Sequence, residues 1–197
     1  MSEIKTRLSY VRDTLLTLRP SANPPPEAYM LAEATILQIR LVCELIGLAA
    51  AVAHHHLGLS KDLLKSWHME RTFGWLEKVN PDCFPRAINP IEPGPRLNVV
   101  LQQDRLNRHD LEKIYVRCGE LLHRGALKAA LTGGVRDYNM TMVNKWAEQI
   151  HDLLSHHIVI PQKAQEFWIV RLHSPPDGAV EVVTLVKPTS VTDLNDD

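Results

Sequence analysis

The sequence predicts an all-α protein, an antiparallel bundle of about five helices that ends in a C-terminal β-hairpin. Three observations lead to this prediction. Apolar residues recur at three- and four-residue spacing up to about residue 156, proline-dense stretches separate the segments with this spacing, and alternation replaces it after Pro161. With 197 residues, of which 45% are hydrophobic, the chain is long enough to bury its own core.

Five segments show the helical spacing, and capping or helix-breaking residues mark several of their ends. Pro20 and the run SANPPPE end the first segment, and Ser60 is the expected N-cap of the third. The fourth stops near Gly125. The expected helices cover residues 3–19, 28–54, 61–79, 110–124 and 141–156.

The second segment is apolar nearly all round, so a membrane span is its main alternative. Its middle holds Glu33, Arg40 and Glu44, and charges near the centre of a bilayer are costly. We therefore expect a central helix covered by the others, with no membrane contact. The three charges share nearly one angular position on the helix. Because buried charges need partners, we expect this stripe to meet Arg117, Glu120 or His123, as a structural ion-pair network or as a positioned catalytic group.

The remaining segments are read as a loop and a hairpin. Residues 80–107 are too rich in proline for regular structure, so we expect an ordered connection or a partly mobile loop there. Two later strands, 167–172 and 179–186, are joined by the turn HSPPDG. The sequence thus predicts three regions, namely a helical bundle over 1–159, a hairpin over 160–187 that packs on the bundle or on a partner, and a flexible acidic tail over 188–197.

Composition and motifs exclude several classes of protein. The net charge of -1 does not fit a general nucleic-acid coat protein, although seven basic against three acidic residues give the window 105–136 a charge of +4. GxGxxG, GxxxxGK[ST], GxSxG, HExxH and CxxC are absent, and we expect neither a metal nor a cofactor. Histidines 54–56 are expected to complement the dipole at a helix end. The cysteine spacing and the charged N-terminus favour reduced thiols and a cytoplasmic location.

The fourth helix carries the most informative pattern. Its expected apolar face comprises Leu111, Ile114, Tyr115, Cys118, Leu121 and Leu122. Arg117, Glu120 and His123 form a contiguous line on its other side. Val116 and Gly119 align with His123 as a small-residue patch that would let another helix approach closely, which suggests a second packing surface or a dimer seam.

These residues resemble the HEPN superfamily (higher eukaryotes and prokaryotes nucleotide-binding). Its members are all-helical domains whose signature is an Arg followed, after four to six residues, by a His near the end of a helix. Here Arg117 and His123 have five residues between them. The long preceding helix with its internal Glu44 extends the resemblance to about residues 28–156.

The resemblance implies a symmetric homodimer in which the Arg and His of both chains face a shared cleft and cut RNA without a metal. By that carry-over, His123 is the general acid–base at a ribose 2′-hydroxyl and Arg117 holds the scissile phosphate. Glu44, Arg40 and Glu120 are the expected supporting residues. The enzyme would be a toxin or phage-defence effector held in check by an antitoxin or another regulatory protein.

Two other functions remain open at this point. Family nucleases usually have a polar residue after the Arg, whereas this chain has Cys118 on its expected core face. This difference favours a catalytically inactive dimer that binds RNA, nucleotide or protein. The third interpretation is a structural oligomerisation module that uses the hairpin edge as a docking strand. A His123 that is exposed, near Arg117 and close to a dimer axis favours the first two functions, and a His123 buried against Glu44 with no cleft favours the third.

Overall fold

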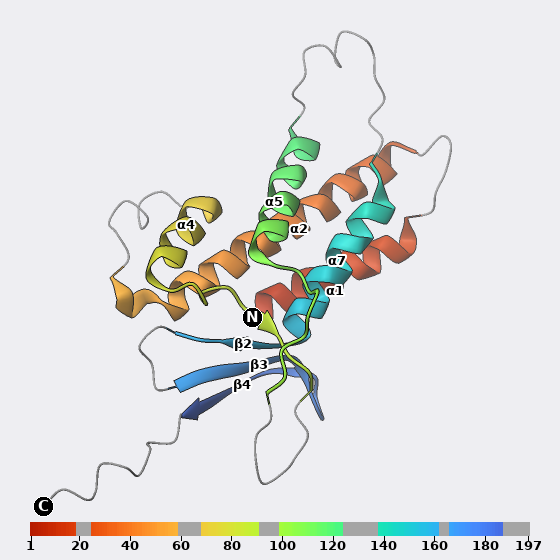
Figure 1. The fold of residues 1–197 in the computed structure, drawn as a ribbon. Helices are drawn as coiled ribbons and strands as arrows, with labels where there is room; N and C mark the ends of the chain where they lie inside the picture. Colours follow the sequence, from red (N-terminus) through yellow and green to blue (C-terminus); the bar gives the residue numbers. More distant parts are fainter. Residues whose placement is uncertain (19–24, 59–67, 91–98, 124–137, 162–165, 187–197) are drawn as a thin grey trace, which may run out of the picture.

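The structure, a computed structural model, describes residues 1–18, 25–58, 68–90, 99–123, 138–161 and 166–186. This part of the chain is mostly helical, with five α-helices and a four-stranded antiparallel sheet at one end of them (Figure 1). The helices are α1 (Ser2–Thr17), α2 (Pro26–Ala53), α4 (Met69–Val79), α5 (Arg108–Leu122) and α7 (Met140–Ser155), with a short 3-10 turn at His55–Leu57. The strands are β1 (Arg86–Ala87), β2 (His156–Val159), β3 (Glu166–Ser174) and β4 (Ala179–Val186).

All five predicted helices are present, with shifts of a few residues at their ends. α5 begins two residues before the predicted start because the side chain of Asn107 accepts a hydrogen bond from the amide of Asp110. Asn139 caps α7 in the same way, by accepting from the amide of Met142. The third predicted helix is confirmed from Met69 onward, and its first part, with the expected Ser60 cap, lies outside the described residues.

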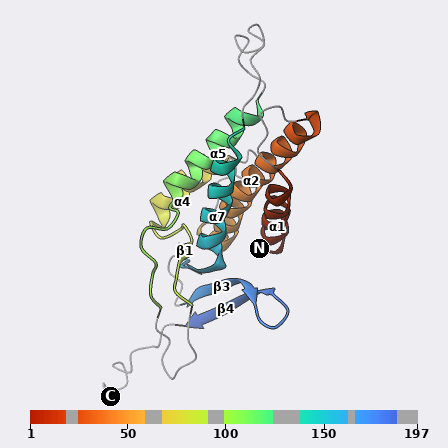
Figure 2. The same cartoon turned by 90° about the vertical axis from the view of Figure 1, so that its right-hand side faces the viewer.

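α2 occupies the centre of the helical layer, as its apolar sequence predicts. It contacts α1, α4, α5 and α7, and two perpendicular views show these helices around it (Figures 1 and 2). Its innermost side chains are fully buried, namely Ile36, Ile39, Val42 and Cys43. By length and composition α2 is the one described helix that could cross a membrane. Half of its most apolar window is buried inside the protein.

The sheet is larger than the predicted hairpin. Its strand order is β1-β2-β3-β4, so the hairpin β3–β4 is present but continues into two further strands. β2 starts at His156, where we expected the last residue of the fifth helix, and pairs residue by residue with β3. β1 lies in the proline-dense segment and pairs with β2. Strands of two and four residues hold too little alternation to be detected from sequence, because their pairing depends on distant partners.

The hairpin packs on the helices of its own chain. β3 contacts α7, and Leu172 of β3 is fully buried in the main core. The Lys5 ammonium of α1 donates to the carbonyl of Gly178 in the hairpin turn. The sheet therefore takes strands from both sides of the predicted boundary at residue 159. The predicted tail at 188–197 lies outside the described residues.

The described part of the proline-dense segment is an ordered connection. Asn80, which is 5% exposed, donates to the carbonyl of Ile160 at 2.8 Å and lies 2.8 Å from Nε2 of His54. Ile88 forms an isolated bridge with Leu101. These bonds tie the segment to α2 and to the residue that follows β2, whereas residues 91–98 lie outside the described part.

Candidate functional site

α5 presents the residues of the predicted motif, and its buried side fixes their direction. Leu111, Ile114 and Cys118 are buried, as the predicted apolar face requires, and Gly119, which the prediction placed outside that face, is buried as well. Arg117 and Glu120 point to solvent from the opposite side, with side chains 53% and 55% exposed. They bond each other, with Arg117 Nη1 donating to Glu120 Oε2 at 2.6 Å. The predicted line of charges on this face is confirmed for these two residues.

A groove between α5 and α7 lies beside Arg117. It is open, with a volume of about 710 Å³. Trp146 of α7 lines it and is only 9% exposed, and Arg117 and Glu120 contribute polar groups. Its other lining residues are His109, Asp110, Glu112, Lys113, Ile114, Val116, Met142, Lys145 and Gln149. The groove therefore combines the indole of Trp146 with charged side chains. This combination suits a ligand that carries a flat ring next to an ionic group.

His123 lies just past the end of α5. Its backbone amide bonds the carbonyl of Gly119 and closes the last turn, but its own φ of -74° and ψ of 124° leave the helix. The residue is exposed, which meets one of the three conditions set for an RNA-related function. It does not line the groove that Arg117 lines. Within one protomer the two motif residues therefore share one end of α5 without sharing the groove.

Arg40 contacts a different part of α5 from the one we expected. Its Nη2 donates to the hydroxyl of Tyr115 at 2.8 Å, and its guanidinium carbon lies 4.1 Å from the centre of the Tyr115 ring. Its Nε lies 3.5 Å from Glu44 Oε1, so two of the three charged residues along α2 pair with each other. The expected ion pairs of this stripe with Arg117 and Glu120 are replaced by the Arg117–Glu120 bond.

Gly119 is the reason that Arg40 can lie so close to α5. A Cβ at this position would collide with the Arg40 guanidinium. Gly119 thus lets another helix, α2, approach closely, which is the second packing surface that the small-residue patch suggested. A dimer seam at this patch stays a prediction. Tyr115, which sequence reasoning placed among the apolar residues, is the partner that was missed. An Arg within an apolar helix was the available signal, but it did not identify the residue that it contacts.

Burial sets the chemistry of the groups beneath this surface. Burial, together with the charge of Glu44, raises the pKa of Tyr115, while Arg40 opposes the shift. Burial likewise raises the pKa of Cys118 to about 12, so its thiol stays protonated at neutral pH. All three cysteines are free and buried, whereas the sequence predicted burial for Cys118 alone. None of these thiols is poised to act as a nucleophile.

Glu33, the third of the charged residues along α2, has a tyrosine partner as well. It accepts a hydrogen bond from the hydroxyl of Tyr138 at 2.6 Å. Tyr138 stands two residues before α7, so the stripe is joined to both α5 and the start of α7. The stripe is therefore a structural network that links three helices.

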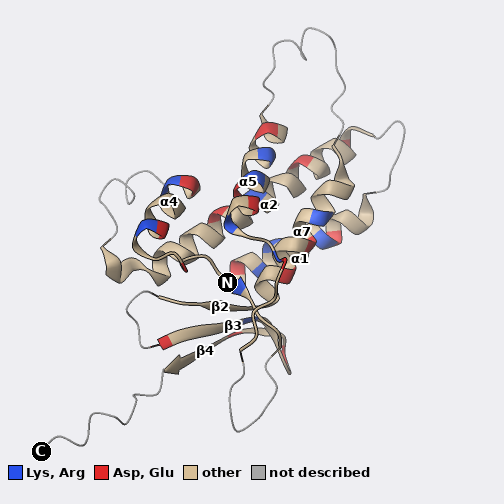
Figure 3. Ribbon diagram, viewed as in Figure 1, with Lys and Arg blue, Asp and Glu red and all other residues tan. Residues whose placement is uncertain are grey.

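The basic window is neutralised by nearby acids. Each of the four Arg and Lys residues in its described part has an acidic partner within 3.1 Å. The pairs are Arg105–Asp152, Arg108–Glu77, Arg108–Glu112, Lys113–Asp110 and Arg117–Glu120. Figure 3 shows the two signs interspersed along α5. A phosphate ligand would thus have to exchange with carboxylates that already hold these cations.

The histidine clusters serve the fold. His54 closes α2, with its Nδ1 2.7 Å from the carbonyl of Ala50, which agrees with the expected role at the helix end. His157, fully inside β2, has its Nδ1 3.0 Å from the carbonyl of Leu154. Within the described residues no group of three or more His, Cys, Asp or Glu side chains is arranged to hold a metal ion.

Comparisons of the chain with models of protein families, with curated proteins and with solved structures give no significant match.

Proposed function

We propose that this chain is a HEPN-like helical bundle that works as a homodimer and cleaves RNA without a metal ion. The observation that carries the proposal is the presentation of Arg117 and His123. Both are exposed at the C-terminal end of α5, while the opposite side of that helix is fixed in the core by Cys118 and its neighbours. A rigid helix that presents a guanidinium and an imidazole at its exposed end is a suitable platform for phosphodiester chemistry.

In this mechanism the two residues divide the work. His123 removes the proton from a ribose 2′-hydroxyl, which attacks the adjacent phosphorus, and an imidazolium protonates the departing 5′-oxygen. Arg117 binds the phosphate and the charge that develops on it. The products are a 2′,3′-cyclic phosphate and a free 5′-hydroxyl. Because Arg117 and His123 do not share a groove in one protomer, the proposal uses residues from two copies around one cleft.

The supporting residues act by holding α5 in place. Arg40 and Glu44 anchor it to α2 through Tyr115, whereas Glu120 competes with RNA for the Arg117 guanidinium. By the same proposal the protein is cytoplasmic and is restrained by an antitoxin or another regulatory protein, as a toxin or phage-defence effector.

A second function, RNA binding without cleavage, is favoured by the Arg117–Glu120 bond of 2.6 Å. A guanidinium held by a neighbouring carboxylate is less available to stabilise a transition state, but it can still exchange onto a ground-state phosphate. The buried Cys118 directly after Arg117 supports the same alternative.

The test is RNA cleavage in EDTA by the wild type and by Arg117→Ala and His123→Ala. The nuclease function predicts fragments from the wild type and none from either variant. His151→Gln is the matched control, because His151 is an exposed histidine of α7 that does not line the groove and has no role in the mechanism. Intact RNA that nevertheless binds in an Arg117-dependent manner supports the binding function. Folded protein that neither cleaves nor binds RNA would contradict both functions.

A further inference from the structure

One face of α2 is left uncovered by the other described helices. Five large apolar residues lie on it at successive spacings of seven, four, seven and four, namely Met30, Leu37, Leu41, Leu48 and Val52. At 100° per residue they fall within about 60° of one another. We call these five residues the α2 strip.

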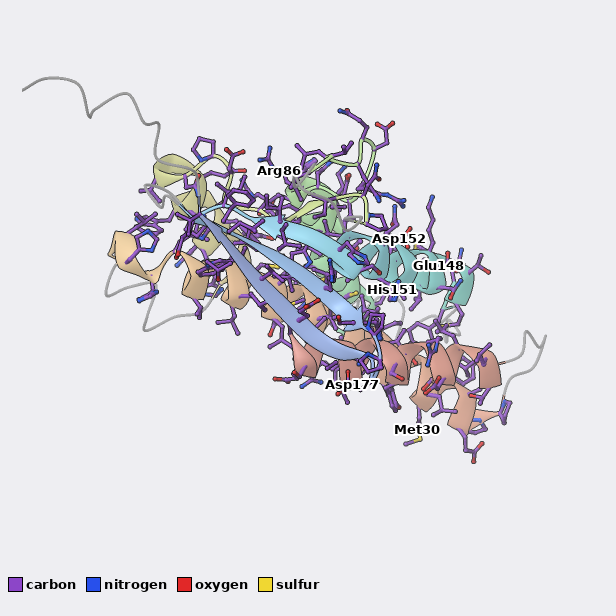
Figure 4. All side chains as sticks on the ribbon, turned by 90° about the horizontal axis from the view of Figure 1, so that it is seen from below. Met30, Arg86, Glu148, His151, Asp152 and Asp177 are labelled. Atoms are coloured by element: carbon purple, nitrogen blue, oxygen red, sulfur yellow. The ribbon has the colours of Figure 1, made fainter. Side chains whose placement is uncertain are left out.

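The α2 strip is exposed along most of its length. Met30 and Val52, at its ends, are 70% and 67% exposed, Leu37 and Leu48 are 42% and 40% exposed, and Leu41 is half-buried. Met30 projects away from the ribbon (Figure 4). The strip is about 33 Å long at 1.5 Å per residue. Scattered exposed leucines are ordinary on a soluble protein, but an aligned strip of this length marks an interaction surface.

The borders of the α2 strip are polar. On one side lie Arg40 and Glu44, which join α2 to α5. On the other side lies Gln38, which accepts a hydrogen bond from Arg7 of α1. Charged residues are sparse along α2 itself (Figure 3). The strip is thus an apolar surface between α1 and α5 with polar margins, which is the usual layout of a protein–protein contact.

The spacing of the strip suits a second helix. Met30, Leu41 and Val52 are separated by eleven residues each, and an 11-residue repeat corresponds to 3.67 residues per turn, close to that of a straight α-helix. A partner helix can therefore follow the strip over its full length without changing its winding.

We propose that the α2 strip is the contact through which two copies of this chain associate, with the two α2 helices antiparallel and the two-fold axis at Leu41. Met30 and Val52 are each eleven residues from Leu41 and meet across the axis. Leu37 and Leu48 of the strip meet two apolar residues outside it, Leu45 and Ala34, which lie four and seven residues from Leu41. Apolar residues therefore face apolar residues along the whole contact. An isologous interface requires this kind of self-matching.

The antiparallel arrangement brings the same polar border of both copies together, because the two-fold axis is perpendicular to the helices. With the axis at Leu41, Arg40 lies two residues along the helix from the partner's Arg40 and two from the partner's Glu44, so the two guanidinium groups are flanked by the two carboxylates. A parallel pair would instead set that border against the Gln38 border. Such a contact buries on the order of 1,000 Å² in total, which is about the minimum for a specific interface.

This surface is argued from the strip alone, independently of the shared RNA cleft of the proposed function. Its experiments measure association in the absence of RNA. A failure of the interface and a failure of RNA cleavage are therefore separate results.

The first experiment measures the mass of the protein by sedimentation equilibrium. The wild type is expected to be a dimer, and Leu48→Glu and Met30→Glu are each expected to weaken association by roughly a hundredfold, since an unpaired carboxylate would be buried. Val182→Glu is the matched control, because Val182 is a 55% exposed valine on β4. Circular dichroism checks that each variant is folded, and Met30 is so exposed that its substitution leaves the core intact.

The second experiment tests the antiparallel register by oxidation of single introduced cysteines. The native cysteines are buried and do not interfere. Leu41→Cys, on the axis, is expected to give a covalent dimer, whereas Met30→Cys alone is not, because its copies lie at opposite ends of the strip. Met30→Cys combined with Val52→Cys restores the cross-link.

Four results overturn the proposal. They are a monomeric wild type at micromolar concentration, a dimer that resists both strip substitutions, a dimer lost in Val182→Glu instead, and a monomer that binds phosphatidylcholine vesicles through the strip. A cross-link in Met30→Cys alone contradicts the antiparallel register.

Discussion

The contact between Arg40 and Gly119 shows how the absence of one side chain can let two helices bind each other. Arg40 reaches Tyr115 only because position 119 has no Cβ. Gly119 lies inside α5, where glycine costs about 1 kcal/mol relative to alanine. The network of Arg40, Tyr115 and Glu44 offsets that cost.

This contact predicts an unusual response to alanine. Gly74→Ala in α4, where nothing lies within 4 Å of the new Cβ, should raise the free energy of unfolding by about 1 kcal/mol. Gly119→Ala should give no gain, because the guanidinium must leave Tyr115. In an Arg40→Ala background the same substitution should again stabilise by about 1 kcal/mol. Urea unfolding measures all four variants, and equal gains at Gly74 and Gly119 in the wild-type background would contradict the contact.

His157 predicts a pH dependence of stability. Burial lowers its pKa from 6.5 to about 4, against the effect of its bond to the Leu154 carbonyl. The unfolded chain therefore takes up a proton near pH 6.5, whereas the folded protein does not until about pH 4. The contribution of the neutral, buried His157 to the free energy of unfolding is complete above pH 6.5. It is lost as the pH falls toward 4, and the total loss is about 3 kcal/mol.

Urea unfolding between pH 4 and pH 7.5 tests this linkage. His157→Gln, which keeps a donor for Leu154, should show a shallower loss of stability on acidification than the wild type. The exposed His109→Gln serves as the control and should retain the wild-type slope. If the free energy of unfolding falls equally with pH in the wild type and in His157→Gln, another group causes the loss of stability at low pH.

At the scale of the element, α5 combines a fixed interior with a charged exterior. The sequence predicted both faces of this helix, including the buried Cys118, because side-chain direction follows from position in a regular helix. It did not predict that Arg117 and Glu120 bond each other or that Arg40 selects Tyr115. The second contact joins residues 75 positions apart, and helical spacing carries no information about such a pair.

The Arg117–Glu120 bond predicts a gain of function. Glu120→Gln removes the carboxylate that competes for Arg117, and RNA affinity should rise by roughly fivefold at low salt. Glu148→Gln removes the same charge from an exposed position on α7 and should have a smaller effect (Figure 4). Fluorescence anisotropy with a single-stranded RNA measures both. Combining Glu120→Gln with Arg117→Ala should abolish the gain, and a gain that survives would place the RNA contact elsewhere.

At the scale of the whole molecule, the helices and the C-terminal hairpin were predictable, whereas β1 and β2 were not. The five helices are long enough for their apolar spacing to repeat over several turns, and proline-rich segments separate them clearly. β3 and β4 were long enough to show alternation. β1 and β2 exist because β3 pairs with β2 and β2 with β1, so they depend on tertiary structure rather than on local sequence.

The arrangement of the whole molecule also separates its two candidate surfaces. The Arg117 groove lies between α5 and α7, whereas the α2 strip runs between α1 and α5. One surface is charged and built around Trp146, and the other is apolar and self-complementary. An RNA-cleaving homodimer needs both kinds of surface, one for substrate and one for association.

The most direct test of the proposed function is the chemistry of the RNA ends. Wild-type protein in EDTA should cut a single-stranded RNA into fragments with 2′,3′-cyclic phosphate and 5′-hydroxyl ends. It should leave an oligonucleotide of the same sequence with 2′-deoxyribose intact, because His123 acts on the 2′-hydroxyl. Cleavage of both substrates, cleavage by His123→Ala, or no cleavage by folded, dimeric protein would contradict the nuclease function.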